Sequence, residues 1–171
     1  MYGLFLSALP ELFVSLNIEN ISVSRISHSR DRFYIGQPIY VVLQQIDFDT
    51  GRISLTHKEL LGTWEENAAL FQAGQTVTGV VRSRKDYGVF IELTPNLSGL
   101  AEPTADLSVG QCVSVYIKSI QPERMKIKLI VIGKLDCAKL PAKKLHYFQT
   151  EGHLDFWQYG VDALVKSYSV F

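Results

Sequence analysis

Cysteine is scarce in this chain of 171 residues, which contains only Cys112 and Cys137. The two do not form a C-x-x-C pair, and their low number excludes the dense disulfide framework of small secreted domains. Such sparse usage fits a reducing compartment better than secretion. We therefore expect a cytoplasmic protein.

Long hydrophobic runs are also missing. The apolar start MYGLFLSALP has no basic segment ahead of it and ends at Pro10. It is too short to span a bilayer and is a poor signal peptide. A membrane is therefore not an expected partner, whereas a content of 47% hydrophobic residues is ample for folded cores.

Net charge is absent overall but not locally. The 17 basic side chains balance the 17 acidic ones, yet residues 76–144 hold eleven basic and six acidic side chains, a net charge of +5. The segments before and after this one carry −3 and −2. The central segment is therefore the basic one, and it is where a polyanionic partner is expected to bind.

The sequence shows no constellation for catalysis or metal binding. His57, His146 and His153 have no partner at metal-ligand spacing. Ser, His and Asp occur together in residues 24–31, but a polar loop holds such residues by composition alone. We expect no enzymatic activity, no catalytic residue, no metal and no other cofactor.

An internal repeat organises the chain. MYGLFLSALPEL (1–12) aligns without a gap with DYGVFIELTPNL (86–97), and GQPIYVVLQQIDFDTGRISL (36–55) aligns with GQCVSVYIKSIQPERMKIKL (110–129). The offset falls from 85 to 74, so the first copy has 11 extra residues, which we place within residues 19–34. The second copy begins with a valine-rich strand in residues 71–85 that has no counterpart in the first.

Short strands broken by Gly, Pro and Asp predict a small barrel or sandwich for each copy. Thr63 and Glu66 fit a capping box and predict a short helix between the copies. Residues 145–150 and 153–159 predict a terminal hairpin, whose aromatics we expect to pack against a neighbour. The β-branched run 163–171, or a neighbouring chain, is predicted to complete the first copy.

Tyr87 and Phe90 flank Gly88 within a strand-like run. A strict period of two would place the two rings on opposite faces of a sheet. A glycine inside a strand often marks a bulge or a close backbone approach, and a bulge re-aims the side chains that follow it. We therefore expect both rings on one surface, where they form a stacking platform.

The ordered motifs resemble a known family. DYGVFIEL (86–93), SGLAEP (98–103), VGQCVSVYIKSI (109–120) and MKIKL (125–129) occur in the second copy, and IDFDTGRISLTHKELLGTWEENA (46–68) begins in the first. This set is similar to the S-one domain, the RNA-binding domain named after protein one of the bacterial small ribosomal subunit. The resemblance implies an all-β fold of two small five-stranded antiparallel OB barrels, the first lacking its opening strand.

The predicted organisation has four parts. They are a partial barrel at residues 1–61, a linker helix at 62–73, a complete barrel at 74–132 and a C-terminal extension with a hairpin at 133–171.

The resemblance also implies an RNA-binding surface of stacking aromatics and basic side chains. Strand parity places Lys126 and Lys128 toward solvent, and Arg82 and Lys118 extend the possible phosphate track. Glu102 replaces the family's histidine and places an acid on that surface. The predicted RNA-binding residues are Tyr87, Phe90, Lys126, Lys128, Arg84 and Lys85 in the second copy, and Tyr2, Phe5 and Arg52 in the first.

The resemblance implies non-catalytic binding of single-stranded RNA, either mRNA or rRNA, in translation or mRNA handling, with the small ribosomal subunit as a candidate partner. One alternative is a protein-interaction or structural module whose RNA surface has degenerated. Another is the RNA-holding part of a larger nuclease or helicase. The polar segment with Arg25, His28, Arg30 and Arg32 is either a second RNA contact or a solvated loop.

Overall fold

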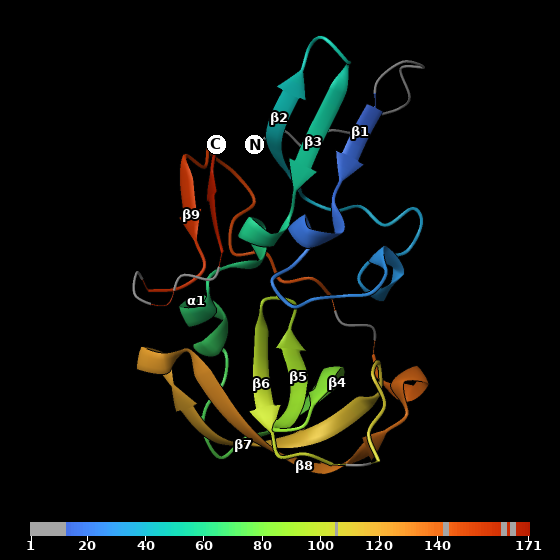
Figure 1. Ribbon diagram of the computed structural model, residues 1–171, viewed down its shortest axis with the longest axis vertical. Coiled ribbons are helices and arrows are strands. Elements are labelled where there is room, and N and C mark those ends of the chain that lie inside the picture. The colour runs from blue at the N-terminus through green and yellow to red at the C-terminus, as the bar shows by residue number, and fades with distance from the viewer. Residues whose placement is uncertain (1–12, 105, 142–143, 162–163, 165–166) are drawn as a thin grey trace.

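The computed structural model describes residues 13–171 except 105, 142–143, 162–163 and 165–166. Its largest unit is a closed barrel of five strands in the lower part of Figure 1. Its strands are β4 (Thr76–Lys85), β5 (Gly88–Thr94), β6 (Leu97–Ala101), β7 (Cys112–Gln121) and β8 (Lys126–Leu135), in the order β4-β5-β6-β8-β7. The predicted barrel of the second copy is thus present, although β6 and β8 run parallel rather than antiparallel.

Alternating side chains fill this barrel. On β8, Ile127 and Leu129 are buried whereas Lys126 and Lys128 are exposed, as a side-chain period of two requires. Burying one such aliphatic side chain fully contributes roughly 1.5–3 kcal/mol. The strands therefore form a packed scaffold whose outer face is free to carry polar and aromatic groups.

From residue 13 onward, the first copy forms an open sheet. β1 (Phe13–Leu16), β2 (Val42–Asp47) and β3 (Arg52–Thr56) pair in the order β1-β3-β2, at the top of Figure 1. Their order and directions match those of β6, β8 and β7 in the barrel. The described residues show one closed barrel and one open sheet, so the predicted pair of barrels is not confirmed.

The repeat holds in the strand register itself. The pairs Leu16/Leu55, Ile46/Ile53 and Asp47/Arg52 of the open sheet correspond to Ala101/Leu129, Ile120/Ile127 and Gln121/Lys126 of the barrel. Even the register irregularity within β2 recurs in β7. The sequence offsets of 85 and 74 therefore identify structurally equivalent residues.

Short helical segments join these units. The 3-10 helix η3 (Lys58–Leu61) leads into α1 (Trp64–Ala68), where the side chain of Thr63 accepts from the amide of Glu66 and the Glu66 carboxylate accepts from the amide of Thr63. The predicted capping box is confirmed, and the helix ends within the predicted linker. The other 3-10 helices are η1 (Ile18–Asn20), η2 (Ser29–Asp31), η4 (Pro122–Arg124) and η5 (Cys137–Lys139).

The C-terminal extension packs between the two units. β9 (Phe156–Gln158) pairs with β10 (Tyr168–Val170) in an antiparallel ribbon. The predicted hairpin between residues 145–150 and 153–159 is therefore wrong, and so is the prediction that the tail itself completes the first copy. The reason lies in tertiary contacts: Phe148 donates its amide to Leu60 of η3, and buried Trp157 and Tyr159 join the barrel core.

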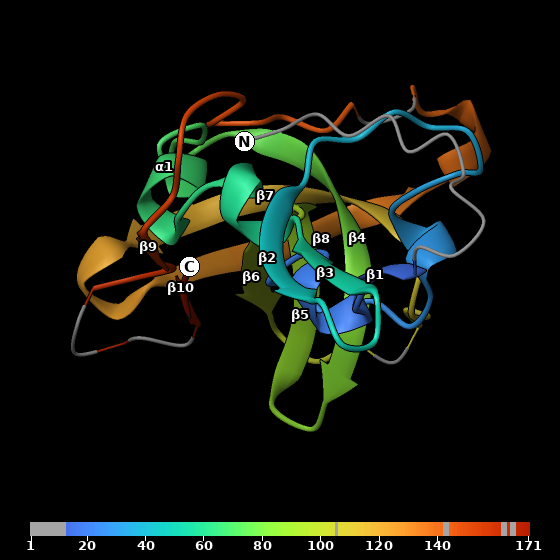
Figure 2. The same cartoon turned by 90° about the horizontal axis from the view of Figure 1, so that it is seen from above.

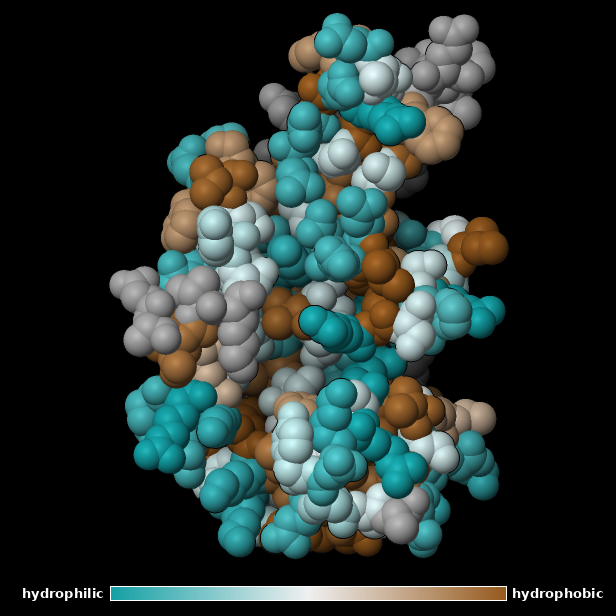
Figure 3. Space-filling view, viewed as in Figure 1, coloured by the Kyte–Doolittle hydropathy of each residue, from teal (hydrophilic) through white to brown (hydrophobic). Residues whose placement is uncertain are grey.

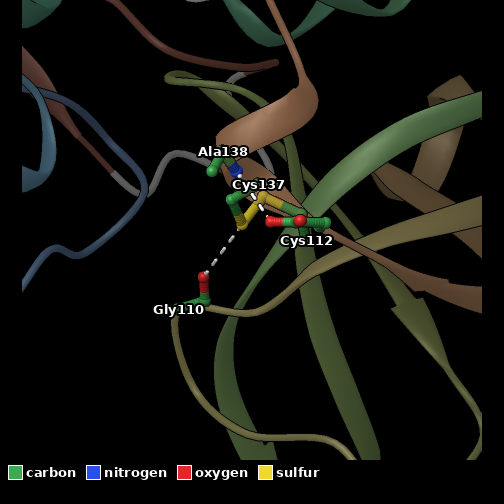
Figure 4. The surroundings of a disulfide bond; sticks show 5 residues. Gly110, Cys112, Cys137 and Ala138 are labelled. Carbon is green, nitrogen blue, oxygen red and sulfur yellow. Dashed lines mark hydrogen bonds between the residues drawn. A yellow bond between two sulfur atoms is a disulfide. The ribbon is translucent and has the colours of Figure 1, made fainter.

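A disulfide links Cys112, the first residue of β7, to Cys137 of η5 (Figure 4). The Cα atoms are 5.4 Å apart, and the two cysteines are separated by 25 positions in the sequence. Because disulfides persist mainly in oxidising environments, this pairing weakens the inference of a reducing compartment that the low cysteine number suggested.

Viewed from above, α1, β9 and β10 lie on one side of the molecule, whereas η2 and η5 lie on the other (Figure 2). Hydrophobic side chains are visible in the hollows between the barrel and the segments above it (Figure 3). None of the helices in the described ranges is long and apolar enough to cross a membrane.

Candidate nucleic-acid interface

Tyr87 and Phe90 lie on one surface of the barrel, as predicted. Lys85 and Gly88 pair across a tight connection between β4 and β5, so Tyr87 lies in the turn and Phe90 in the strand. The ring centroids are 6.2 Å apart and the planes are nearly perpendicular. Tyr87 is 66% exposed and Phe90 is half-buried. Edge-to-face contact fixes both rings while leaving aromatic surface in solvent.

Gly88 allows a close backbone approach rather than a bulge. A Cβ at this position would lie 2.6 Å from the carbonyl oxygen of Ala101 on β6. Register shifts in β5 and β4 occur elsewhere, between Glu92 and Thr94 and between Val81 and Ser83. Of the two predicted explanations, close approach is confirmed, and the rings share a surface because Tyr87 lies in the turn.

The outer row consists of Phe90, Leu100 and Lys128 on three neighbouring strands. Phe90 of β5 is paired with Leu100 of β6, which is paired with Lys128 of β8. Paired residues project to the same face of a sheet, here the outer face, where Leu100 is half-buried and Lys128 exposed. With Tyr87 at its end, the outer row combines a stacking platform with a cationic group.

A shallow hollow of about 460 Å³ borders the outer row. Its lining includes Tyr87 and Leu100 together with Lys118, Lys128 and Glu102. Lys118 and Glu102 are both exposed. The hollow therefore offers apolar surface and two ammonium groups, but it also carries the carboxylate that replaces the family's histidine.

The remaining predicted basic residues of the barrel lie near this surface. Lys126 is exposed at the start of β8, and Lys85 is exposed at the end of β4. Arg84 is exposed, with its guanidinium 3.5 Å from the carbonyl oxygen of Thr104. These positions permit contact with a phosphate backbone.

Arg82 has another partner and does not belong to a free phosphate track. Its Nε lies 2.8 Å from Glu92, whose carboxylate also accepts from Arg32 at 2.7 and 3.0 Å. Burial raises the pKa of Glu92, but the hydrogen bonds and positive charges of the two arginines outweigh burial and lower the pKa overall. The triad of Arg32, Arg82 and Glu92 was not predicted from the sequence. The only indication was that Glu92, an acidic residue, lies within a predicted strand.

The first copy offers fewer of the predicted contacts. Tyr2 and Phe5 lie outside the described residues. Arg52 is exposed at the position equivalent to Lys126, and it pairs across the hairpin with Asp47. Hydrogen bonds from Thr50 lower the pKa of the Asp47 carboxyl. Ser54 occupies the position equivalent to Lys128, so this sheet lacks the lysine of the outer row.

The five-stranded barrel and its exposed aromatic and basic face define a small OB-type domain. No protein-family model matches the chain. It is 30% identical over 127 residues to small ribosomal subunit protein bS1 of Rhizobium meliloti (strain 1021), covering 67% of this chain and 22% of the relative. The bS1 protein of Staphylococcus aureus (strain COL) is 32% identical over 132 residues, covering 67% and 34%.

These relatives confirm the resemblance: the chain contains an S-one-type OB domain. Among solved structures, GSP13 from Bacillus subtilis is 28% identical, with a TM-score of 0.33 over 43% of this chain and 63% of that one. The chain spans between about a fifth and a third of the length of the bS1 relatives named above.

Proposed function

We propose that the barrel binds single-stranded RNA without catalysis, through Tyr87, Phe90 and the neighbouring lysines. The outer row is the observation that supports this function, because it aligns an aromatic ring on β5 with a lysine on β8 across Leu100 of the intervening β6. Stacking on such rings is worth roughly 1–3 kcal/mol per base and tolerates any sequence. The similarity to bS1 supports a cytoplasmic role in translation or mRNA handling, with mRNA or rRNA as the bound RNA. It also makes the small ribosomal subunit a candidate partner.

Fluorescence anisotropy with labelled oligouridylate tests the proposal. The double variant Tyr87→Ala/Phe90→Ala should lose most binding, because both stacking surfaces are removed. Circular dichroism must show an unchanged barrel, since Phe90 is half-buried. The control is Phe48→Ala, which removes an 88% exposed aromatic from the hairpin between β2 and β3.

Lysine variants test the phosphate contact separately. Lys128→Ala should weaken binding for all sequences, and the slope of log K against log salt should flatten by about 0.7. Wild-type protein that fails to bind RNA at low salt would contradict the proposed function.

A protein-binding module is the second candidate function. The open sheet and its flanking loops expose large apolar side chains, with Phe13 at 73%, Phe48 at 88% and Ile35 fully exposed. Exposed apolar groups of this kind are typical of protein interfaces. This second function predicts a protein partner that covers these side chains and removes them from solvent. It replaces RNA binding as the proposed function if Tyr87→Ala/Phe90→Ala does not change RNA affinity.

A further inference from the structure

The insert is the segment 17–41 that joins β1 to β2. Its equivalent in the barrel is the shorter connection 102–111 between β6 and β7. In Figures 1 and 2 the blue part of the insert with η2 leaves the open sheet and lies beside the barrel. The surplus residues of the first copy therefore contribute to the surroundings of the second.

Specific hydrogen bonds hold the insert against the outer face of β5 and β6. Val23 donates its amide to the side chain of Asn96 at 2.9 Å, and the hydroxyls of Ser24 and Ser98 are 2.8 Å apart. Farther along, Arg32 makes its bidentate contact with Glu92. The insert is thus docked on the barrel at two points, residues 23–24 and Arg32, rather than solvated throughout.

This docking site adjoins the outer row. Glu92 and Ser98 form a cross-strand pair, just as Phe90 and Leu100 do; Glu92 lies two residues after Phe90 on β5, and Ser98 lies two residues before Leu100 on antiparallel β6. Two residues correspond to roughly 6.7 Å, and residues two apart share a face. A strand of RNA that extends beyond the row in this direction must meet the insert.

The exposed cations of the insert are Arg25 and Arg30. Arg25 directly follows the docked Ser24, and Arg30 lies in η2. The carboxylate of Asp31 accepts from the amides of Ser27 and His28, which turns it toward the loop backbone. Within the described part of the chain, neither arginine has a carboxylate within 4.0 Å.

We propose that the insert is a second phosphate-binding surface, on which Arg25 and Arg30 contact the backbone of RNA that continues beyond the outer row. The inference rests on the proposed RNA binding by the barrel. Arg32 and Glu92 position the insert and do not contact RNA. Binding should therefore depend on RNA length, because only a strand longer than the row reaches these arginines.

Oligouridylates of about 6 and about 14 nucleotides test this length dependence, since one OB barrel binds about 4–16 nucleotides. Arg25→Ala/Arg30→Ala should weaken binding of the longer RNA about five- to tenfold and flatten its salt slope by about 1.4. Affinity for the shorter RNA should stay within about twofold. Arg124→Ala removes a positive charge from an exposed site in η4, on the opposite side of the molecule from η2 in Figures 1 and 2, and should leave both affinities within about twofold.

The outcomes separate the two claims. If the longer RNA binds the arginine variant as tightly as wild type, while Tyr87→Ala/Phe90→Ala abolishes binding, the insert has no RNA contact but the barrel function stands. If the shorter RNA loses as much affinity as the longer one, the arginines act on the row itself and the inference is wrong. If wild type binds neither RNA at low salt, both claims fail.

Discussion

Arg32 and Glu92, 60 positions apart in sequence, form a buried bidentate ion pair that joins the insert to strand β5. Only 6% of either side chain is exposed, and Arg82 contacts the same carboxylate. Removing one partner from such a site leaves buried charge without compensation. The pair therefore couples the position of the insert to the stability of the barrel.

Glu92→Gln should lower the free energy of unfolding by about 3 kcal/mol, because two buried guanidinium groups lose their counter-charge. Urea denaturation followed by tryptophan fluorescence measures the change. Glu151→Gln, at an exposed position, is the control and should change stability by less than about 0.5 kcal/mol. Equal effects of the two substitutions would show that the triad does not hold the insert.

His57 predicts a pH dependence of stability. The side chain is completely buried; its Nδ1 donates to the carbonyl of Ile21 at 2.7 Å, and its Nε2 accepts from the hydroxyl of Tyr147 at 3.0 Å. Burial lowers its pKa from 6.5 to about 4. Between these values the unfolded chain binds a proton that the folded chain does not, so stability falls as pH falls through this window.

The loss should approach about 3 kcal/mol between pH 6.5 and pH 4, as measured by urea denaturation across that range. His57→Gln is expected to be less stable at neutral pH but to lack this contribution to the pH slope. His153→Gln, an exposed control, should keep the wild-type slope. Parallel pH profiles for all three proteins would exclude His57 as the source.

Gly88→Ala tests the close approach of β5 and β6. The new Cβ would meet the carbonyl of Ala101 and the side chain of Leu100, so the strands must shift, at a cost of about 1–3 kcal/mol. Because Leu100 belongs to the outer row, RNA affinity should fall with stability. Gly133→Ala on β8 is the matched control, since no atom lies within 4 Å of its Cβ position. A Gly88→Ala protein as stable as this control would contradict the geometry.

Glu102 is expected to weaken RNA binding, since its carboxylate lines the same hollow as Lys118 and Lys128. Both Glu102→Gln and Glu102→His should tighten binding by about two- to fivefold at low salt, because repulsion of phosphate is removed. Anisotropy titrations give the affinities. Glu65→Gln, at an exposed position of α1, removes the same charge at a distance and should leave affinity unchanged. Weaker binding by both Glu102 variants would place the carboxylate in a favourable RNA contact.

Local patterns predicted much of the barrel and its face. Strand parity placed Lys126 and Lys128 outward, the capping box placed α1, and the ungapped repeat predicted a register that the open sheet reproduces. Each of these signals spans few residues or compares one copy with the other. These signals could be predicted because the spacing of residues along the chain determines which face of a strand, or which end of a helix, each side chain occupies.

Contacts between distant side chains could not be predicted in the same way. The tail pairs with residues 156–158 because Trp157 and Tyr159 enter the barrel core, which strand propensity alone does not indicate. Arg82 was predicted to be a free cation because nothing in the sequence shows that its guanidinium contacts the carboxylate of Glu92. The disulfide was equally hidden, because two cysteines 25 positions apart carry no spacing signal.

The disulfide also determines how mechanical load would reach the barrel. Cys112 begins β7 and Cys137 follows β8, so the covalent link closes the whole β7–β8 hairpin into a ring. Tension applied at the C-terminus passes from Cys137 directly to Cys112 and does not peel β8 from β7. The hairpin that carries Lys118, Lys126 and Lys128 is thereby protected against being peeled open by a pull on the tail.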